Sequence, residues 1–302
     1  MTPVAEVCVR SGFVAVVGRP NVGKSTLINS LVGHKVTITS KRPQTTRLSV
    51  RGVLTVDDPA AQIVFVDTPG LHRPRTALGE RLNATAYRTV TGADCTAFVI
   101  DATGRVGPGD RRIAEHLLDT VDPEQVILIV NKVDAASRGR VAERLSEAAL
   151  WDFGAYIPVS ALEGDGLDSV VAELIPRLPE SLALYPSDVV SDRPDEVLIA
   201  ETIREKLLPG LRQELPHSVA VKTEAIEVRD DGLTRIEAVI YVERESQKGI
   251  VVGAGGANLR DAGTMARHEL EQALGRRVFL DLRVKVEKDW QRYPDRIERL
   301  GL

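Results

Sequence analysis

The octapeptide GRPNVGKS at positions 18–25 limits the possible folds of this 302-residue chain more than any other stretch. It has the spacing G-x-x-x-x-G-K-S, follows the apolar run FVAVV, and leads into the helix-like sequence STLINSLVG. In such a strand–loop–helix unit, backbone N–H groups wrap around phosphate groups and the helix dipole attracts negative charge. The pattern therefore predicts a phosphate-binding loop. A chance match in a glycine turn is the alternative, and the flanking strand and helix disfavour it.

Apolar runs rich in Val and Ile recur through the first 180 residues, and amphipathic helical sequence follows each of them. The runs span 13–18, 63–70, 95–102, 125–132 and 155–161. Strands of this kind in alternation with helices are typical of a parallel sheet that helices cover on both faces. We therefore predict an α/β fold with a mostly parallel sheet for this part of the chain.

The character of the sequence changes at residues 176–196, where four prolines and several acids indicate a linker. Beyond it the sequence predicts a helix, two strands joined by the turn RDDG, further helical sequence to about 274, and a last strand over 277–286. This order indicates a smaller α+β domain. We predict these boundaries: first domain 8–180, linker 181–195, second domain 196–288, and C-terminal tail 289–302.

Composition excludes several classes of protein. A net charge of −4 argues against a coat of basic residues for bulk nucleic-acid binding, so any such contact must be local. Cys8 and Cys95 lie in apolar surroundings outside any C-x-x-C, which fits buried thiols rather than a disulfide framework or a zinc site. The chain begins without an apolar stretch of signal-peptide length, and no run reaches the ~20 apolar residues of a membrane span. We expect a cytoplasmic protein that is at most peripheral on the membrane.

Two residues of the first motif carry phosphate chemistry. Lys24 would neutralise the β- and γ-phosphates, and the hydroxyl of Ser25 would bind Mg²⁺. DTPG, residues 67–70, ends the second apolar run. Asp67 is placed there to hold Mg²⁺ through water, and the N–H of Gly70 to sense the γ-phosphate as part of a switch.

Between these two motifs lies KRPQTTR, residues 41–47, which is polar and poor in strand formers. One of its threonines is expected to cap Mg²⁺: Thr46 is preferred and Thr45 is the alternative. A plain solvated loop with a basic flank is the other interpretation of this segment.

The motif NKVD, residues 131–134, predicts which nucleotide base is bound. It caps an apolar strand. The carboxylate of Asp134 can accept from both N–H groups on the Watson–Crick edge of guanine, an edge that adenine does not present. Asn131 can bond the base edge or tie the loops together, and the aliphatic stem of Lys132 can cover the ring. VSA ends the next strand, and the amide of Ala161 could reach guanine O6.

The motifs GRPNVGKST, PQTTR, DTPGLH, NKVD and VSA, with a second domain that carries VERESQK and GIVVGAGGANLR, resemble the Era family of bacterial ribosome-assembly GTPases. The similarity runs from Phe13 to the terminal ERLGL. It implies a GTPase domain followed by a type II KH domain, binding of GTP or GDP with Mg²⁺, and hydrolysis of GTP. It also implies binding of 16S rRNA near its 3′ end during assembly of the 30S subunit, a monomeric state, and peripheral contact with the inner membrane.

The residues that we expect to line the nucleotide come from the motifs GRPNVGKST, DTPGLH, NKVD and VSA. They are Gly18, Arg19, Pro20, Asn21, Val22, Gly23, Lys24, Ser25, Thr26, Asp67, Thr68, Pro69, Gly70, Leu71, Asn131, Lys132, Val133, Asp134, Ser160 and Ala161.

The glycine-rich stretch at 249–260 follows a strand-like run, which is the setting of a dinucleotide-binding turn. The dinucleotide fingerprint G-x-G-x-x-G fails, because the last position after Gly253 and Gly255 is Asn258. What remains is G-x-x-G, Gly253 to Gly256, the form of a KH loop that clamps a single-stranded backbone beside an apolar groove. A mere turn is the alternative, which the surrounding elements disfavour.

One departure from the family concerns the interior of this loop. Era relatives usually carry a lysine there, whereas this chain has Ala254 and Gly255. Positive charge must then come from elsewhere; the candidates are Lys248, Arg260, Arg276 and Arg277. Residues 247–302 hold eleven Lys and Arg against eight Asp and Glu, so RNA binding is expected to depend only modestly on salt.

Catalysis shows a second departure, this time from Ras-like GTPases. The glutamine that orients the attacking water in those proteins is replaced by Leu71. In GTPases resembling Era, the asparagine at position 21 helps to hold a K⁺ ion beside the phosphates; the alternative is that Asn21 only stabilises the loop. Intrinsic hydrolysis should be slow either way.

Two other functions stay open: a GTPase whose second domain binds protein or membrane, and an RNA-binding protein with an inactive nucleotide site.

Overall fold

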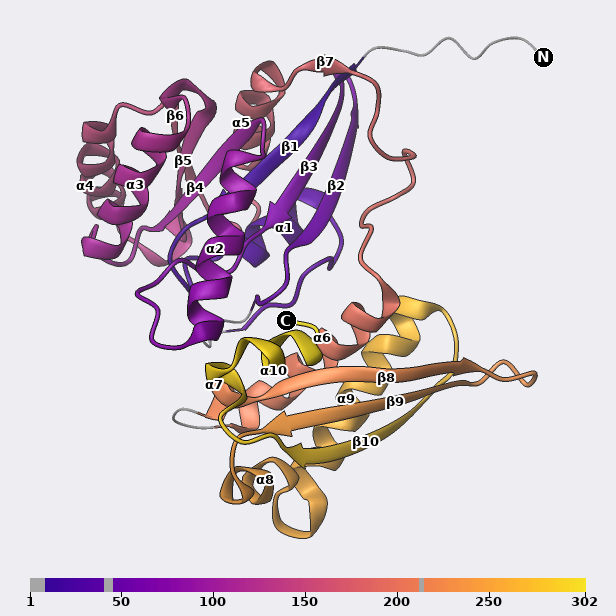
Figure 1. Ribbon diagram of the computed structural model, residues 1–302. Helices are drawn as coiled ribbons and strands as arrows, with labels where there is room; N and C mark the ends of the chain where they lie inside the picture. The colour runs from indigo at the N-terminus through magenta and orange to yellow at the C-terminus, as the bar shows by residue number, and fades with distance from the viewer. Residues whose placement is uncertain (1–8, 41–45, 212–214) are drawn as a thin grey trace, which may run out of the picture. The chain divides into compact units, whose positions relative to one another are not determined.

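A computed structural model describes residues 9–40, 46–211 and 215–302 of the chain (Figure 1). The chain divides into two compact units, whose main bodies end at Asp192 and begin at Arg193. Cys8 lies outside the described residues, whereas Cys95 is a buried free thiol. Burial raises the pKa of Cys95 to about 12, so this thiol is inert at neutral pH. Among the described helices, none combines the length and the apolar composition needed to cross a bilayer.

The first unit is built on a sheet with the strand order β2-β3-β1-β4-β5-β6, and a seventh strand, β7, pairs with β1. The neighbours from β3 to β6 are parallel, as predicted. The strands are β1 Val9–Val17, β2 Val50–Asp57, β3 Ala60–Asp67, β4 Cys95–Asp101, β5 Val126–Asn131, β6 Ala155–Val159 and β7 Glu180–Ser181. The helices are α1 Lys24–Val32, α2 Ala77–Thr91, α3 Pro108–Thr120, α4 Arg138–Ala148 and α5 Leu167–Leu174.

Helices cover both faces of this sheet (Figure 1). Successive side chains of β4 alternate between two cores: Val99 packs with residues of α1 and α5, and Phe98 with residues of α2, α3 and α4. Every residue of β5 is buried. This arrangement brings the carboxyl ends of β1, β3, β4, β5 and β6 to one edge of the sheet, where ligands of parallel α/β folds bind.

The sequence reading missed strand β2. It forms an antiparallel hairpin with β3 at the edge of the sheet. VRGVLTVD lacks the continuous apolar run of the central strands because much of it is only half-buried. Gly52 adds to the weak signal, and its reason is packing: a Cβ there would lie 3.0 Å from methyl groups of Val32 and Val36.

Residues 182–192, within the stretch predicted as a linker, lie along β2 and β3 and are called the strap below. The side chain of buried Gln62 accepts from the amides of Leu184 and Tyr185 at 2.7 and 2.8 Å and donates to the Tyr185 carbonyl at 2.9 Å. The amide of Val53 on edge strand β2 donates to the carbonyl of Val190 at 2.9 Å. The strap thus covers an exposed strand edge that would otherwise leave backbone groups unpaired.

The second unit is a three-stranded sheet with helices. Strand order is β10-β9-β8; β8 and β9 are antiparallel and β9 and β10 parallel. The strands are β8 Ala220–Val228, β9 Thr234–Val242 and β10 Val278–Val286. The helices are α6 Asp195–Leu207, α7 Leu215–Ser218, α8 Glu245–Val252, α9 Ala257–Leu274 and α10 Pro294–Arg299. The predicted tail also belongs to this packing, because Trp290 is fully buried and donates from Nε1 to the Ser218 carbonyl at 3.0 Å.

The strand-like run before the glycine-rich stretch is β9, but the sequence reading missed helix α8, which lies between β9 and the loop. A capping box fixes the start of this helix: the side-chain oxygen of Gln247 accepts from the amides of Glu243 and Arg244 at 2.8 and 3.2 Å. A short apolar run such as IVV does not by itself distinguish strand from helix. Only Val251 of this helix is buried, which fits one face of a helix.

Candidate functional site

The loop that joins β1 to α1 requires glycine at two positions. Gly18 and Gly23 have φ angles of 150° and 97°. A Cβ at Gly18 would lie 2.3 Å from the carbonyl oxygen of Val99, and one at Gly23 would lie 2.3 Å from Nδ2 of Asn131. The backbone therefore passes too close to its neighbours for any side chain, and its N–H groups wind ahead of α1 as a phosphate-binding loop does.

Lys24 is buried at the start of α1, where its Nζ donates to the carbonyls of Gly18 and Arg19 at 3.2 and 3.1 Å. Burial lowers the pKa of Lys24 to about 8, and the nearby carboxylate of Asp67 opposes that shift. Bound phosphates would add negative charge beside the ammonium group and raise this pKa again.

This shift predicts a pH dependence of nucleotide binding. Above about pH 8 Lys24 loses its proton in the nucleotide-free protein, whereas it keeps the proton in the GTP complex. GTP affinity should therefore fall by up to about tenfold per pH unit. Calorimetry at about pH 8.5, in two buffers of different ionisation enthalpy, should show uptake of a proton on binding. At about pH 6.5 Lys24 is already charged and the uptake should vanish, which serves as the control. Equal proton uptake at both pH values would contradict the assignment.

Asp67 ends β3, is fully buried, and gathers three hydroxyl groups. Its Oδ2 accepts from Ser25 at 2.8 Å, Thr37 at 2.7 Å and Thr46 at 3.1 Å. The hydroxyls of Ser25 and Thr46 are 3.1 Å apart, while Thr45 lies outside the described residues. The sequence reading missed Thr37, since it belongs to no motif and reaches Asp67 only through the fold.

The second carboxylate oxygen of Asp67, Oδ1, is buried and has no hydrogen-bond partner. Burial raises the pKa of Asp67, and the positive charge of Lys24 opposes that shift. A hard cation beside Oδ1 would remove both the orphaned acceptor and the cost of burying the charge. The hydroxyl and carboxylate oxygens of Ser25, Thr46 and Asp67 thus fit Mg²⁺.

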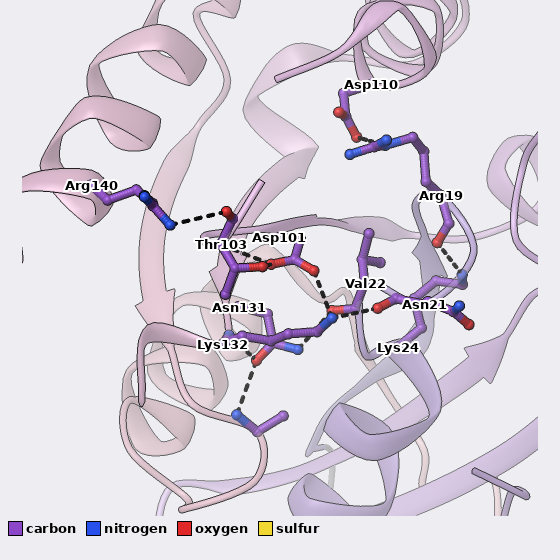
Figure 2. Close-up of polar contacts among 11 residues, drawn as sticks. Arg19, Asn21, Val22, Lys24, Asp101, Thr103, Asp110, Asn131, Lys132 and Arg140 are labelled. Carbon is purple, nitrogen blue, oxygen red and sulfur yellow. Dashed lines mark hydrogen bonds and ion pairs between the residues drawn. The ribbon is translucent and has the colours of Figure 1, made fainter. Parts of the chain in front are cut away.

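The predicted base-binding loops are held together by Asn131 (Figure 2). Its Nδ2 donates to the Val22 carbonyl at 2.9 Å, and its Oδ1 accepts from the amides of Lys132 and Ala161 at 2.8 and 3.0 Å. Of the two roles open to Asn131, the structure displays the tie between loops. The amide of Ala161, which could reach guanine O6, here serves the same tie.

Asp134 is exposed beyond β5, and its Oδ1 accepts from the buried hydroxyl of Ser160 at 2.6 Å. Lys132 spans back to the phosphate-binding loop, where its Nζ donates to the Asn21 carbonyl at 2.6 Å (Figure 2). Val133 begins the 3-10 turn Val133–Ala135. The two loops thus present a carboxylate and a lysine stem at the carboxyl edge of β5 and β6.

The remaining predicted residues of the switch loop contact the end of β1 and the phosphate-binding loop. The hydroxyl of buried Thr68 donates to the Val16 carbonyl at 2.7 Å, and buried Leu71 donates from its amide to the Gly18 carbonyl at 3.1 Å. A Cβ at Gly70 would lie 2.7 Å from the backbone of Pro20. The switch loop therefore rests on the phosphate-binding loop through a glycine. Pro69 precedes this contact, and Thr26 lies in the first turn of α1.

In the second unit, the loop from Gly253 to Gly256 has three residues with positive φ: Gly253, Gly255 and Gly256, at 76°, 58° and 79°. A Cβ at Gly253 would lie 2.7 Å from Cγ of Asn258, whose Nδ2 donates to the Ile250 carbonyl at 2.9 Å. Asn258, which breaks the dinucleotide pattern, therefore braces this loop. Ala254 and Gly255 are exposed at its tip.

A groove of about 630 Å³ runs beside this loop between α9 and β10. Its lining is Leu233, Gly256, Leu259, Arg260, Gly263, Thr264, Arg267, Val278, Phe279, Leu280 and Leu282. An apolar trough that starts at a G-x-x-G loop is the form in which KH domains take single-stranded bases. Arg260 lines the groove, and its Nη2 donates to the Gly255 carbonyl at 3.3 Å.

The other predicted RNA-binding cations lie outside the groove lining. Arg276 donates to Asp195 at 3.4 Å and Arg277 to the Asp231 carbonyl at 3.3 Å, so both already have partners in the second unit. Lys248 lies half-buried on α8. Arg267, which the sequence reading did not select, lines the groove together with Arg260. Its position seven residues after Arg260, about two turns further along α9, is the signal that would have found it.

Comparisons with known proteins agree with this architecture. The family described as 50S ribosome-binding GTPase matches residues 13–132, and the KH domain family matches residues 214–291. GTPase Era of Mycobacterium avium (strain 104) is 50% identical over 296 residues, covering 97% of this chain and 98% of its own. GTPase Era of Mycobacterium tuberculosis (strain ATCC 25177 / H37Ra) is 49% identical, covering 96% and 98%.

Solved structures give the same result. An Aquifex aeolicus Era variant bound to GDP·AlF4⁻ matches with a TM-score of 0.91 and 39% identity, covering 97% of this chain and 99% of that one. A structure of Era with MgGDPNP and nucleotides 1506–1542 of 16S ribosomal RNA matches with the same TM-score, identity and coverage. The resemblance seen in the motifs is confirmed over almost the whole length, and the chain belongs to the Era family of GTPases.

Proposed function

We propose that this chain is a GTP-hydrolysing switch that binds 16S rRNA near its 3′ end through the groove of its KH domain and assists assembly and maturation of the 30S ribosomal subunit. The observation that carries the proposal is the apolar groove that opens at the G-x-x-G loop, in a chain that also holds an oxygen-lined phosphate site. The Era structure that contains nucleotides 1506–1542 of 16S rRNA supports the choice of RNA.

We propose that GTP or GDP binds with Mg²⁺, held by Ser25, Thr46 and Asp67. When bound, Mg²⁺ supplies positive charge that bridges and neutralises phosphate oxygens. Lys24 contributes a fixed positive charge at the phosphates, and Gly70 offers its N–H from a loop that rests on Pro20. Leu71 is buried and carries no polar group, so it cannot orient the attacking water. Slow intrinsic hydrolysis follows from this site.

A potassium ion would supply charge that the protein itself does not. Asn21 sits in the phosphate-binding loop at a φ of 64°, which asparagine tolerates better than most residues. We propose that its side chain helps to hold K⁺ beside the phosphates; a role in the turn alone is the competing interpretation.

Replacement of KCl by NaCl is therefore expected to lower GTP turnover, because Na⁺ is smaller than the K⁺ ion that the proposed site would hold. Asn21→Ala should have low turnover in both salts, without the dependence on K⁺. Turnover at equal ionic strength is the measurement, and GDP affinity in both salts is the control for loop integrity. Equal wild-type rates in the two salts would leave Asn21 with a structural role only.

The RNA assignment is tested on isolated small subunits. Crosslinks from bound protein, mapped with GTP or GDP present, should join residues 249–286 to the 3′-end region of 16S rRNA. Crosslinks elsewhere in the chain would instead favour a second domain that binds protein or membrane. We further propose that the protein is a cytoplasmic monomer whose contact with the membrane is peripheral.

A further inference from the structure

The sequence GPGD at 107–110 belongs to none of the motifs used so far, yet it builds a specific structure at the start of α3. The carboxylate of Asp110 is almost fully buried, and its Oδ2 accepts from the amide of Gly107 at 2.9 Å. Its other oxygen, Oδ1, accepts from Nε of Arg19 at 2.7 Å (Figure 2). A residue of the phosphate-binding loop is thereby tied to a helix that carries no nucleotide motif.

Gly109 of GPGD leaves a notch in which Arg19 lies, and Gly107 borders it. A Cβ at Gly109 would stand 2.6 Å from Cδ of Arg19, and one at Gly107 would stand 3.9 Å from its Nη1. Arg19 satisfies a carboxylate that would otherwise be a buried, unpaired charge, so its guanidinium is directed at α3. Its own carbonyl accepts from Nζ of Lys24 at 3.1 Å. The position of Lys24 therefore depends on how Arg19 is held.

A second tie comes from the end of β4. Asp101 accepts from Nζ of Lys132 at 2.6 Å, and the same ammonium donates to the Asn21 carbonyl at 2.6 Å. The other oxygen of Asp101 is fixed by the amide and hydroxyl of Thr103, at 2.8 and 2.6 Å. Arg140 of α4 in turn donates to the Thr103 carbonyl at 3.3 Å (Figure 2).

We propose that the connection from β4 to α3, residues 101–110, is a clamp on the phosphate-binding loop, and that Asp110 and Asp101 are positioning residues for nucleotide binding. Asp110 acts through Arg19 and Asp101 through Lys132. The clamped residues 19 and 21 flank Pro20, on which Gly70 of the switch loop rests. Left-handed residues such as Asn21 persist only where the surroundings hold them. The proposal rests on the nucleotide site described above.

The test is a double-mutant cycle on Arg19 and Asp110. Asp110→Asn keeps an oxygen for the Gly107 amide but removes the charge that holds Arg19; Arg19→Gln removes the other partner. Each change should weaken binding of a fluorescent GDP by about three- to tenfold, and the double variant no further than the weaker-binding single variant. Thermal melts of each variant report folding. Additive losses, or unchanged affinity in both single variants, would overturn the clamp.

Further variants separate the clamp from general destabilisation. Glu201→Gln breaks a buried pair with Arg204 in the second unit; it should lower the melting temperature and leave GDP affinity unchanged. Gly109→Ala pushes Arg19 out of its notch with Asp110 intact, so it replaces Asp110→Asn if that variant does not fold. The Asp101 arm is tested in the same way, with Asp101→Asn and Lys132→Gln. If wild type fails to bind GDP or GTP, the proposed function fails; binding with an additive cycle rejects the clamp alone.

Discussion

Asp134→Asn is expected to weaken GTP binding by at least about a hundredfold and to turn the preference of the site towards xanthosine triphosphate. The carboxylate can accept from both N–H groups of guanine, whereas the amide presents one acceptor and one donor. The donor faces a guanine N–H and leaves both groups unpaired. Xanthine has a carbonyl where guanine has its amino group, and the amide matches that edge.

The measurement is competition of GTP and xanthosine triphosphate for one fluorescent nucleotide. Asp165→Asn is a matched control, since this neighbouring residue accepts from the Ser160 amide through its backbone carbonyl, at 2.9 Å. It should leave the preference for guanine intact. The hydroxyl of Ser160 can accept from the new amide at position 134, so the loop should keep its position. Unchanged GTP affinity in Asp134→Asn would reject NKVD as the base-reading motif.

Gly256→Asp is expected to abolish RNA binding while GTP binding and intrinsic hydrolysis persist. Gly256 lines the groove, so a carboxylate there would meet the phosphate backbone with like charge. The variant should still fold: a Cβ at this position meets open space, and a φ of 79° is one that aspartate tolerates better than most residues. Gly253 would be a poorer test, because a Cβ there clashes with Asn258.

RNA affinity at several salt concentrations, beside a thermal melt, gives the readout. Gly301→Asp is the matched control: it has a φ of 77°, open space for a Cβ, and no part in the groove lining. Ala254→Lys should do the opposite of Gly256→Asp, tightening binding and steepening its salt dependence by up to about one phosphate contact. A folded Gly256→Asp variant with wild-type affinity for 3′-end RNA would show that this loop is only a turn.

The sequence predicted the central sheet because buried parallel strands leave a signal that needs no tertiary knowledge: continuous Val and Ile runs between helices. Strand β2 left no such signal, since five of its eight residues are exposed or only half-buried and its hairpin with β3 sets its register. Helix α8 was missed because its apolar run IVV is too short to show a helical period, and its start depends on the side chain of Gln247. In both cases the secondary structure is decided by contacts with residues outside the segment itself.

The site likewise contains residues that a sequence motif identifies and residues that only the folded structure brings together. Motif residues such as Lys24 and Asp67 could be named because phosphate and metal chemistry requires them at fixed spacing. Thr37 and Asp110 could not, since their partners lie 30 and 91 residues away in sequence. Asn131 shows the limit most clearly. Its motif was evident, but the bonds that it makes to Val22 and Ala161 depend on three loops that meet only in the folded chain.

The strap changes the reach of the RNA-binding unit. A free linker over 181–195 would have a root-mean-square span of about 20 Å. That span would lower the effective concentration of one unit around the other. Gln62 and Val53 fix the strap as far as Val190, and Arg51 holds its end through Asp192 at 2.7 Å. Only residues 193 and 194 then remain before α6, about 7 Å of extended chain. The tether between the two units is therefore short. When the second unit binds ribosomal RNA, the GTPase unit is kept at a high effective concentration near that RNA.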